Sequence, residues 1–491
     1  QKPVQSRVKK TSEDTTKVRK REATPQKQPA KSKVYLIHSD LLRKDSRNPD
    51  AQVVVGNVVF RHDSVYMYCD SAYYYDKISS FEAFSNVKMN QGDTLFLYGD
   101  RLYYDGNTQI AEVRMNVRME NRNTTLLTDS LNYDRVYNLG YFFDGGTLMD
   151  EQNVLTSEWG EYNPGTKQSV FNYNVKLVNP QFTLTSDTLE YNTASKVANI
   201  VGPSDILSDN NHIYSERGTY NTMTGKAYLL DRSVLTNEGK QLTGDSLFYD
   251  RNEGLGEAFR NMVLTDTINK NMMTGEYGFY NEKRGYAFAT DKAVAIDYSQ
   301  GDSLFLHGDT LLMETFHLDT DSMFREMRAF HKVRFYRTDV QGVADSLVFS
   351  SKDSCLTMYR DPILWNESQQ LVGEKICIYM NDSTIDWAHI TGKEMKAYFR
   401  DRQMYKTEVI GSVRVVYYPM DSDSTLIGMN VSETSKLDIY LENQKLEKMV
   451  MSPKSNGTLY PITQIPSGTD KLQNFVWFDY IRPLNKEDIF N

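Results

Sequence analysis

The chain has 491 residues, a formal net charge of −9 and 40% hydrophobic residues, with a mean hydropathy of −0.57. No apolar run approaches the ~18 residues that a transmembrane helix needs, and three cysteines are too few for a disulfide framework. Tyr (33) and Phe (22) are abundant. Aromatic residues between frequent Asn, Asp, Gly and Ser are typical of strands and turns, so we expect a nearly all-β protein.

The first 33 residues differ in charge from the rest of the chain. They hold 11 Lys or Arg and three acidic residues, whereas the rest holds the other 45 of 56 basic and 62 of 65 acidic residues. Such a polar segment cannot order itself by burial, so residues 1–33 are expected to form a disordered basic tail. The tail is either a solvated linker or a contact for anionic lipid or saccharide phosphates. The acidic remainder excludes nucleic acid as the main partner, because that role needs a basic surface on the folded part.

A repeat begins near residue 75. A Tyr followed by Asp or Asn recurs every 29 residues for six intervals, and a seventh interval is 31. Strand-forming residues before each pair and turn-forming residues after it predict a unit of strand, turn, strand, turn. One unit cannot bury its apolar face alone, so the copies are expected to stack around one elongated core. The eight tyrosines are Tyr75, Tyr104, Tyr133, Tyr162, Tyr191, Tyr220, Tyr249 and Tyr280.

An apolar column is expected inside this stack. Residues two apart on a strand share a face, which places each Tyr beside the residue two positions before it, and an Asn-Val-x-apolar motif on the returning strand adds valines. This column is either a packed core or a hydrophobic trough for long acyl chains. Glycines at the apolar position (Gly160, Gly218 and Gly278) are expected to widen the interior. The candidate column residues are Leu102, Tyr104, Val117, Leu131, Tyr133, Val175, Leu189, Tyr191, Val234, Leu247, Tyr249 and Val263.

A second column is acidic, and the period of two predicts that it shares the face of the apolar column. In-register carboxylates about 5 Å apart repel each other, so they are expected at a solvated rim, where they accept turn amides or bind divalent ions. The nearest match to a calcium loop, DSDSTLIG, has Leu426 where the loop needs Gly. The seven histidines show no ligand spacing, so we expect no metal site and no cofactor. The acidic positions are Asp100, Asp129, Glu158, Asp187, Glu216, Asp245 and Glu276.

The letters GDSL, which occur twice, also belong to a hydrolase motif whose Ser is a nucleophile. Ser246 or Ser303, together with Asp386 and His389, supplies the letters of a catalytic triad. However, the serine position is filled by Arg101 in a sister unit, and the α/β pattern of such hydrolases is absent. The motif is therefore expected to be structural, and the protein is expected not to be an enzyme.

The repeat fades toward the C-terminus. Residues 34–379 are expected to form the repeat domain, and residues 380–491 a continuation with atypical units. The closing segment KLQNFVWFDYIRPLNKEDIFN is expected to fold back as a cap or to serve as a docking segment. A disulfide bond between Cys355 and Cys377 stays open, because nothing in their spacing requires it.

The order of these motifs resembles a known family. The repeats (GDsLfYd, a turn, then NVxL), the late motifs GSVRVVYYPMDSDSTLIGMN and SNGTLYPI, and the closing F-x-W…RP…DIF pattern are similar to the OstA/LptA-like family of lipopolysaccharide-transport proteins, and most of all to the large OstA-like proteins of Bacteroidota. The resemblance covers residues 33–491. It implies an elongated β-jellyroll whose two sheets form a V-shaped groove for the acyl chains of lipid A. It also implies partners that add strands at exposed edges, either other jellyroll components of the transport bridge or further copies of this chain.

The expected function is therefore non-enzymatic lipopolysaccharide binding and transport in the periplasm, in support of outer-membrane assembly, with the apolar column as the lipid site. The first residue, Gln1, fits a removed secretory signal. Two alternatives stay open, an outer-membrane β-barrel and a purely structural periplasmic scaffold. A barrel needs strands of ~9–11 residues with an outward apolar band, and the shorter apolar alternation here disfavours it.

Overall fold

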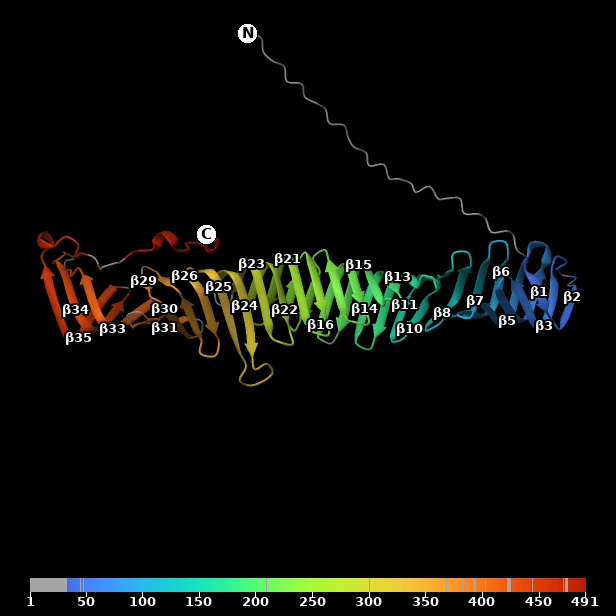
Figure 1. The fold of residues 1–491 in the computed structure, drawn as a ribbon, viewed down its shortest axis with the longest axis horizontal. Helices are drawn as coiled ribbons and strands as arrows, with labels where there is room; N and C mark the ends of the chain where they lie inside the picture. The colour runs from blue at the N-terminus through green and yellow to red at the C-terminus, as the bar shows by residue number, and fades with distance from the viewer. Residues whose placement is uncertain are drawn as a thin grey trace, which may run out of the picture.

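The computed structural model describes residues 33–491, except residues 45, 47, 209, 300, 368, 382, 383, 392, 393, 402, 422–424, 444, 471 and 473–475. The basic tail predicted for residues 1–33 lies outside the described residues, apart from Lys33. The described strands form one continuous antiparallel sheet of 35 strands. Figure 1 shows that this sheet is an elongated ladder, with β1 to β3 at one end and β33 to β35 at the other.

Long strands make up most of the ladder. Two long strands that follow each other in the sequence pair with each other, as β5 does with β6. They are rich in β-branched and aromatic residues and end at turns that contain Asn, Asp and Gly, as the composition predicts. The long strands are β3 (Gln52–His62), β4 (Val65–Tyr75), β5 (Ser80–Gln91), β6 (Leu95–Asp105), β7 (Ile110–Asn121), β8 (Thr124–Asp134), β13 (Gln168–Asn179), β14 (Phe182–Asn192), β15 (Val197–Ser208), β16 (Asn211–Asn221), β21 (Leu255–Asp266), β22 (Asn271–Asn281), β23 (Tyr286–Asp297), β24 (Leu304–Phe316), β25 (Phe324–Arg337) and β26 (Val340–Ser350).

Some rungs of the ladder are split into two short strands that lie end to end. For example, β9 and β10 both pair with β8, and β11 and β12 both pair with β13. The short strands are β1 (Tyr35–His38), β2 (Leu41–Lys44), β9 (Leu139–Phe142), β10 (Gly146–Asp150), β11 (Asn153–Ser157), β12 (Trp159–Tyr162), β17 (Lys226–Leu230), β18 (Val234–Asn237), β19 (Lys240–Thr243), β20 (Ser246–Asp250), β27 (Cys355–Tyr359), β28 (Ile363–Asn366), β29 (Gln369–Val372) and β30 (Lys375–Asn381).

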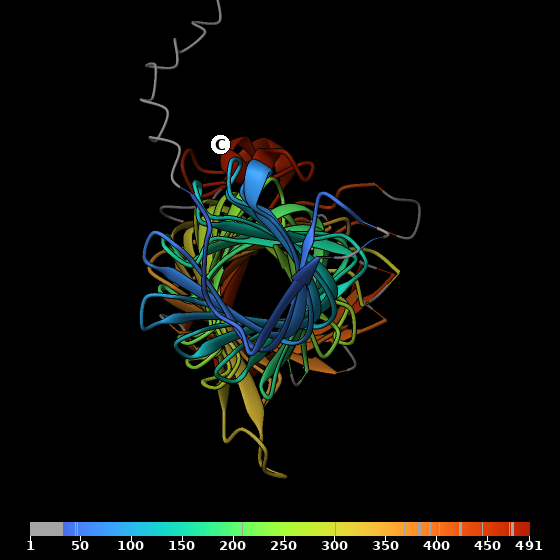
Figure 2. The ribbon, with the colours of Figure 1, turned by 90° about the vertical axis from the view of Figure 1, so that its right-hand side faces the viewer.

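Each long strand bends near its middle. The returning strands carry two consecutive residues with positive φ at this point, such as Met115 (62°) and Asn116 (52°), and the pairing register shifts there. Such a bulge adds a residue to one strand and increases the local twist. The sheet therefore folds over onto itself, and Figure 2 shows the strands wrapping around the long axis. The inner faces share one hydrophobic core that extends from Val34 to Met404, which confirms the predicted all-β repeat jellyroll.

The ladder continues past residue 379 without a break, because β30 pairs with β31. The domain boundary placed there from the sequence stays a prediction. A small second core, formed by Val409, Val413 and Leu437, follows the main one. The last elements are β31 (Thr384–Thr391), β32 (Met395–Arg400), β33 (Gln403–Tyr417), β34 (Met429–Glu442) and β35 (Lys445–Tyr460), and the short 3₁₀ turns are η1 (Asp76–Ile78), η2 (Ile462–Gln464), η3 (Asp479–Ile481) and η4 (Asp488–Phe490).

The C-terminal segment turns back along the ladder (Figure 1). The Arg482 guanidinium donates to Oε1 of Gln341 in β26 at 2.6 Å, and the Phe490 ring lies 4.8 Å from the His307 ring in β24. The segment therefore packs on strands that precede it by more than 100 residues. Its role as a cap or a docking segment stays a prediction.

Candidate lipid-binding site

The repeated tyrosines form one row across the ladder. Backbone pairing links Tyr104 to Ala111, Ala111 to Tyr133 and Tyr133 to Gly140. The same alternation of a Tyr with Ala, Gly or Ser continues strand by strand to Tyr280. A small residue between two rings leaves room for both, which explains why the tyrosine recurs on every second strand and the sequence repeats with each strand pair. At the first unit, Tyr74 joins this row through Phe81, so the prediction of Tyr75 for that position was wrong.

Four of the row tyrosines, Tyr104, Tyr133, Tyr191 and Tyr280, have hydroxyls that bond with polar side chains at the opposite ends of the folded-over strands. The buried hydroxyls of Tyr162 and Tyr249 have no hydrogen-bond partner among the described residues. The Tyr104 hydroxyl lies 2.6 Å from Nδ1 of His62, which ends β3. Lys240 Nζ donates to the Tyr280 hydroxyl at 2.7 Å.

The folded sheet brings its two rows of strand ends face to face, and we call the line between the two rows the mouth. These bonds join the two rows across it. We call them the mouth latch. Its bonds across the mouth are His62–Tyr104, Gln91–Tyr133, Asp150–Tyr191–Asn153, Asp150–Lys196, Gln181–Arg251 and Lys240–Tyr280. Within one row, Arg135 and Arg251 donate to the hydroxyls of Tyr104 and Tyr220.

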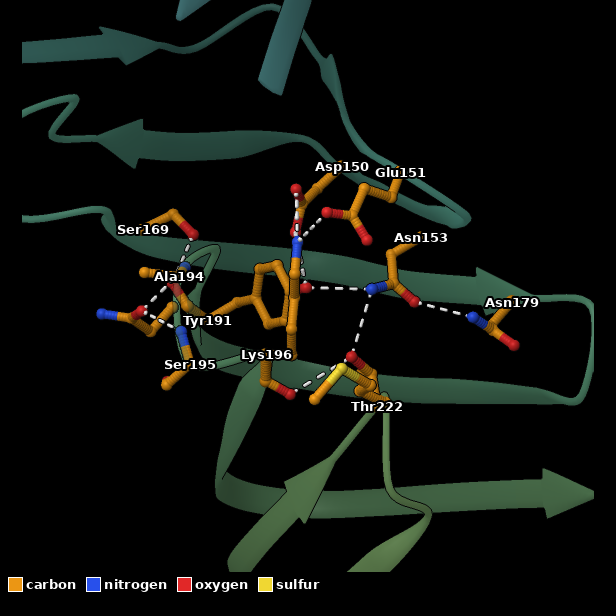
Figure 3. A network of polar contacts seen from close by, with 12 residues as sticks. Asp150, Glu151, Asn153, Ser169, Asn179, Tyr191, Ala194, Ser195, Lys196 and Thr222 are labelled. Atoms are coloured by element: carbon orange, nitrogen blue, oxygen red, sulfur yellow. Dashed lines mark hydrogen bonds and ion pairs between the residues drawn. The ribbon is translucent and has the colours of Figure 1, made fainter. Parts of the chain in front are cut away.

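The middle of the mouth latch contains a buried ion pair, drawn in Figure 3. Lys196 Nζ lies 2.8 Å from Oδ2 of Asp150, and the two side chains are 12% and 2% exposed. The Tyr191 hydroxyl donates to the same carboxylate at 2.8 Å and accepts from Nδ2 of Asn153 at 2.9 Å. A buried ion pair is stable only when further hydrogen bonds satisfy its charges, and this network supplies them. The mouth is therefore closed at this level.

Burial keeps the latch phenols neutral. It raises the pKa of Tyr104 to about 12 against the lowering effect of Arg135, and it raises the pKa of Tyr220 to about 12. It raises the pKa of Tyr133, Tyr191 and Tyr249 as well. Near neutral pH these phenols consequently stay protonated and remain hydrogen-bond donors.

The row changes beyond Tyr280. Backbone pairing continues it through Ala287, Met313, Met327 and Phe349 to residues that likewise carry no hydroxyl, Leu356 and Ile378. Over these strands the row has no group that bridges the mouth as the tyrosines do. The mouth latch thus ends at the Lys240–Tyr280 bond.

An apolar cavity of about 270 Å³ opens where the latch ends. Its walls are leucines and methionines from β21 to β30, including Leu306, Met313 and Met327, with the small Ala295 among them. Methionine side chains are flexible and adapt to ligands of different shape. Polar residues gather at the strand ends of the cavity: Lys240, Asp266, Asn271, Asp297, Arg325 and Ser351.

A larger hollow, of about 860 Å³, lies elsewhere, at the outer bend of β5 to β10. Asp100, Asp129 and Arg118 help to line it, and the two aspartates are exposed. Charged, water-facing walls suit a polar ligand and not an acyl chain. The smaller inner cavity is therefore the better candidate for a lipid.

Comparison with known families identifies the first half of the ladder. The family model of OstA-like proteins matches residues 31–187 and 183–245. We call these matched residues, 31–245, the OstA-like part of the chain. The OstA-like part contains nearly all of the mouth latch, whereas the cavity lies beyond it, except for Lys240.

Thirteen chains of solved structures also match. One is the crystal structure of LptH from Pseudomonas aeruginosa, described as the LptA homologous periplasmic component of the conserved lipopolysaccharide transport device. It is 13% identical, with a TM-score of 0.21, and the match covers 25% of this chain and 82% of LptH. No curated protein matches the sequence.

The structure buries ten of the twelve predicted column residues, each at most 3% exposed. Val234 and Val263 were wrong, because they lie on the other face and Leu235 and Leu264 point inward instead. The bulges before them place Ser233 and Met262, not the valines, at the inward position that Val175 occupies in its own unit. Lipid contact by the column residues stays a prediction.

The predicted widening of the interior by glycines was also wrong. A Cβ at Gly160 would meet the rings of Phe142 and Phe171, and one at Gly218 would meet the Tyr228 carbonyl. Gly278 is closed in the same way by Phe288. Neighbouring groups fill the space that the missing side chains leave, so the OstA-like part has a packed core and no open trough.

The sequence motifs past residue 300 carried a signal for the cavity. In GDTLLM and ADSLVF the position of the repeated tyrosine holds Met313 and Phe349. Neither residue has a hydroxyl to bridge the mouth, and the cavity lies at these two side chains. Residues that the sequence reasoning missed, such as Lys196 and Arg325, have no distinctive pattern around them.

The acidic column lies at the outer bend and not on the inner face as predicted. Asp100 is exposed whereas Leu102 and Tyr104 are buried, because the register shift at the bend interrupts the period of two. The carboxylates accept bonds from asparagines of the next strand's bulge, as in Asn116 Nδ2 to Asp100 at 2.6 Å and Asn261 Nδ2 to Asp245 at 3.1 Å. In the part of the chain that the structure describes, no group of three His, Cys, Asp or Glu is placed to hold a metal ion.

The triad suggested by the GDSL letters does not assemble. Ser246 begins β20 and His389 lies in β31, nine strands further along the ladder. At the usual strand spacing they are roughly 40 Å apart, and Ser303, just before β24, is roughly 25 Å from β31. A nucleophile and its base must be in hydrogen-bond contact.

Among the described helices, none is long and apolar enough to cross a membrane.

Proposed function

We propose that this protein binds lipopolysaccharide by its acyl chains and carries it through the periplasm toward the outer membrane, without catalysis. The observation that carries the proposal is the apolar cavity between the inner faces of a β-jellyroll whose first half is OstA-like. The resemblance of the repeats to lipopolysaccharide-transport proteins supports the class of cargo. An apolar cavity within an otherwise packed ladder supports the acyl chain as the part that is bound.

The proposal also gives the predicted column residues a role. In the closed state they are packed against each other, so an acyl chain reaches Leu189 or Tyr191 only after the mouth latch opens. The cavity is then the resting lipid site, and the column is the path along which a chain moves when neighbouring latch bonds part.

The ends of the ladder are the proposed contacts with other jellyroll proteins or with further copies of this chain. The last strand, β35, has 16 residues, most of them exposed, and pairs only with β34 among the described strands. An exposed edge strand of this length invites the addition of a strand from a partner.

In-cell photocrosslinking tests the proposed cargo. A photoreactive amino acid replaces Leu306 or Met327 in the cavity, Leu189 in the packed column, or the exposed Tyr228 on the outer face as the control. Lipopolysaccharide adducts are expected at the two cavity positions, fewer at Leu189 and none at Tyr228. Absence of adducts at both cavity positions, with the protein folded, would leave the structural scaffold as the function.

A further inference from the structure

We propose that the cavity selects a single acyl chain that carries an anionic head group, and that Arg325 binds this head group. The inference rests on the proposed lipid cavity and adds the class of ligand that the cavity accepts. It follows from the volume of the cavity, the position of Arg325 and the pairing of the other charged groups around it.

The volume limits the ligand to one chain. An apolar protein cavity of roughly 150 Å³ holds one benzene molecule. The cavity here measures about 270 Å³, so by the same scale it holds a chain of roughly ten carbons. A lipid with several chains would place one of them here and leave the others outside.

Arg325 is placed to meet the end of such a chain. It lies two residues before Met327 in β25, so both side chains point to the inner face, and both line the cavity. Two hydrogen bonds to Ser351 hold the backbone of Arg325 in place. The Arg325 amide donates to Oγ of Ser351 at 2.8 Å, and the Arg325 carbonyl accepts from the Ser351 amide at 2.9 Å. The start of the side chain is therefore fixed at the edge of the cavity.

The Arg325 guanidinium has no hydrogen bond or ion pair with any other residue that the structure describes, and the residue is half-buried. A guanidinium carries five donors in a fixed plane that match a carboxylate or a phosphate. A partly buried cation without a protein partner, next to an apolar cavity, is complementary to an anionic amphiphile.

The other charged groups around the cavity already have partners. Lys240 donates to the Tyr280 hydroxyl, and Glu326 pairs with Arg328 at 2.6 Å. Asp266 accepts backbone amides of its own turn, from Ile268 and Asn269.

Two further carboxylates near Arg325 are also engaged. Asp297 accepts the backbone amide of Ser299 at 2.8 Å, and Glu314 lies 3.7 Å from Arg328. None of these acids pairs with Arg325, so the donors of its guanidinium are left for a ligand.

Calorimetric titration of the full chain at neutral pH tests the selection with three probes of equal chain length: decanoate, decyl maltoside and decyltrimethylammonium. Decanoate is expected to bind about tenfold more tightly than the cationic probe, the usual scale of one charge-assisted hydrogen-bonded pair. In Arg325→Gln, decanoate is expected to weaken about tenfold, while decyl maltoside binds as it does to the wild type. The matched control is Arg284→Gln, which removes an exposed cation in the turn between β22 and β23. It is expected to leave the binding of decanoate and of decyl maltoside unchanged.

The outcomes separate this inference from the proposed function. If all three probes bind equally well, or if Arg325→Gln keeps the preference for decanoate, the head-group selection is wrong while the cavity stands. If no probe binds and the cavity positions give no crosslinks, the lipid site itself is wrong. Unchanged binding of decyl maltoside shows that Arg325→Gln is folded around its cavity.

Competition identifies the source of the chain. Lipopolysaccharide that displaces decanoate from the wild type indicates that one of its own acyl chains occupies the cavity with an anionic group at Arg325. Failure to displace it points to a free single-chain anionic amphiphile as the ligand, which contradicts lipopolysaccharide as the occupant but retains the selection for charge.

Discussion

The OstA-like part of the ladder and the strands that follow it have the same backbone plan but opposite interiors. In the OstA-like part, and onward as far as β22, the hydroxyls of Tyr104, Tyr133, Tyr191 and Tyr280 bond across the mouth, and the core behind them is packed. From β23 to β30 the row continues as Met313 and Phe349, and a cavity opens. One recurring side chain therefore decides whether the folded sheet is closed or hollow.

The physical reason lies in the polar tip of tyrosine. Its ring fills the core, and its hydroxyl is satisfied when it reaches a partner at the opposite strand end. A methionine or phenylalanine fills part of the same space but cannot hold the two strand ends together. The closed part is suited to act as a rigid wall, and the hollow part to hold a ligand.

The largest expected effect comes from breaking the ion pair of the closed part. Lys196→Met leaves the buried Asp150 carboxylate without its cation, which costs roughly 3–5 kcal/mol when a buried pair is broken. Hydrogen exchange of the amides in β10 and β14 measures this loss as faster local opening. The exposed Lys176→Met is the control; equal exchange in the two variants would show that the pair does not hold the mouth closed.

A milder break removes a single hydroxyl. Tyr191→Phe keeps the ring but deletes the bonds to Asp150 and Asn153. Asp150 still pairs with Lys196 and Asn153 still bonds Thr222, so the expected loss is that of a hydrogen bond to a charged group, about 1.5–3 kcal/mol. The same exchange measurement is expected to show faster opening near β14, but less than for Lys196→Met. Tyr228→Phe, on an exposed outer tyrosine, is the control and should leave exchange unaltered.

One substitution is expected to extend the closed plan into the hollow part. Latch tyrosines find partners about forty residues earlier, as in Tyr104 with His62 and Tyr280 with Lys240. Met313→Tyr is therefore expected to place its hydroxyl near Asn271, fill part of the cavity and weaken decanoate binding about tenfold, or ~1.4 kcal/mol. Leu312→Tyr, on the opposite face of the same strand, is the control. Unchanged binding in Met313→Tyr would mean that the cavity is not where the chain sits.

Much of the fold was predictable from the sequence because the repeat records it directly. The spacing of Tyr133, Tyr162 and Tyr191 fixes two strands per unit, and period-two alternation places most of the column inside. The errors occur at the bends: the extra residue of each bulge moves Asp100 outward and shifts Val234 and Val263 off the inner face. The motif Asn marks several of these bulges, since Asn86, Asn116, Asn174 and Asn261 adopt positive φ there, but Arg232 and Lys292 do so without such a signal.

The candidate site was less predictable than the fold. The sequence marks the tyrosines as interior but does not show that their hydroxyls meet groups from other units, since Asp150 and Tyr191 are 41 residues apart. The cavity depends on the absence of such a bridge, and an absence has no motif. Only the loss of Tyr at Met313 and Phe349 pointed to it.

The smallest effect at neutral pH, and the most direct test of the closed interior, is the ionisation of its phenols. A tyrosine of the unfolded chain ionises near pH 10, whereas burial raises the pKa of Tyr104 and of Tyr220 to about 12. As pH rises, the unfolded chain therefore loses these protons first, so the stabilisation is complete below pH ~10 and is lost between pH ~10 and ~12. Ultraviolet titration should show a group of phenols that ionise only above pH ~11, together with local opening of β6 and β16 in the same range. Tyr104→Phe should remove part of this late phase, and an unaltered titration in that variant would mean that the Tyr104 phenol is open to water and that the mouth is not closed at the first rung of the latch.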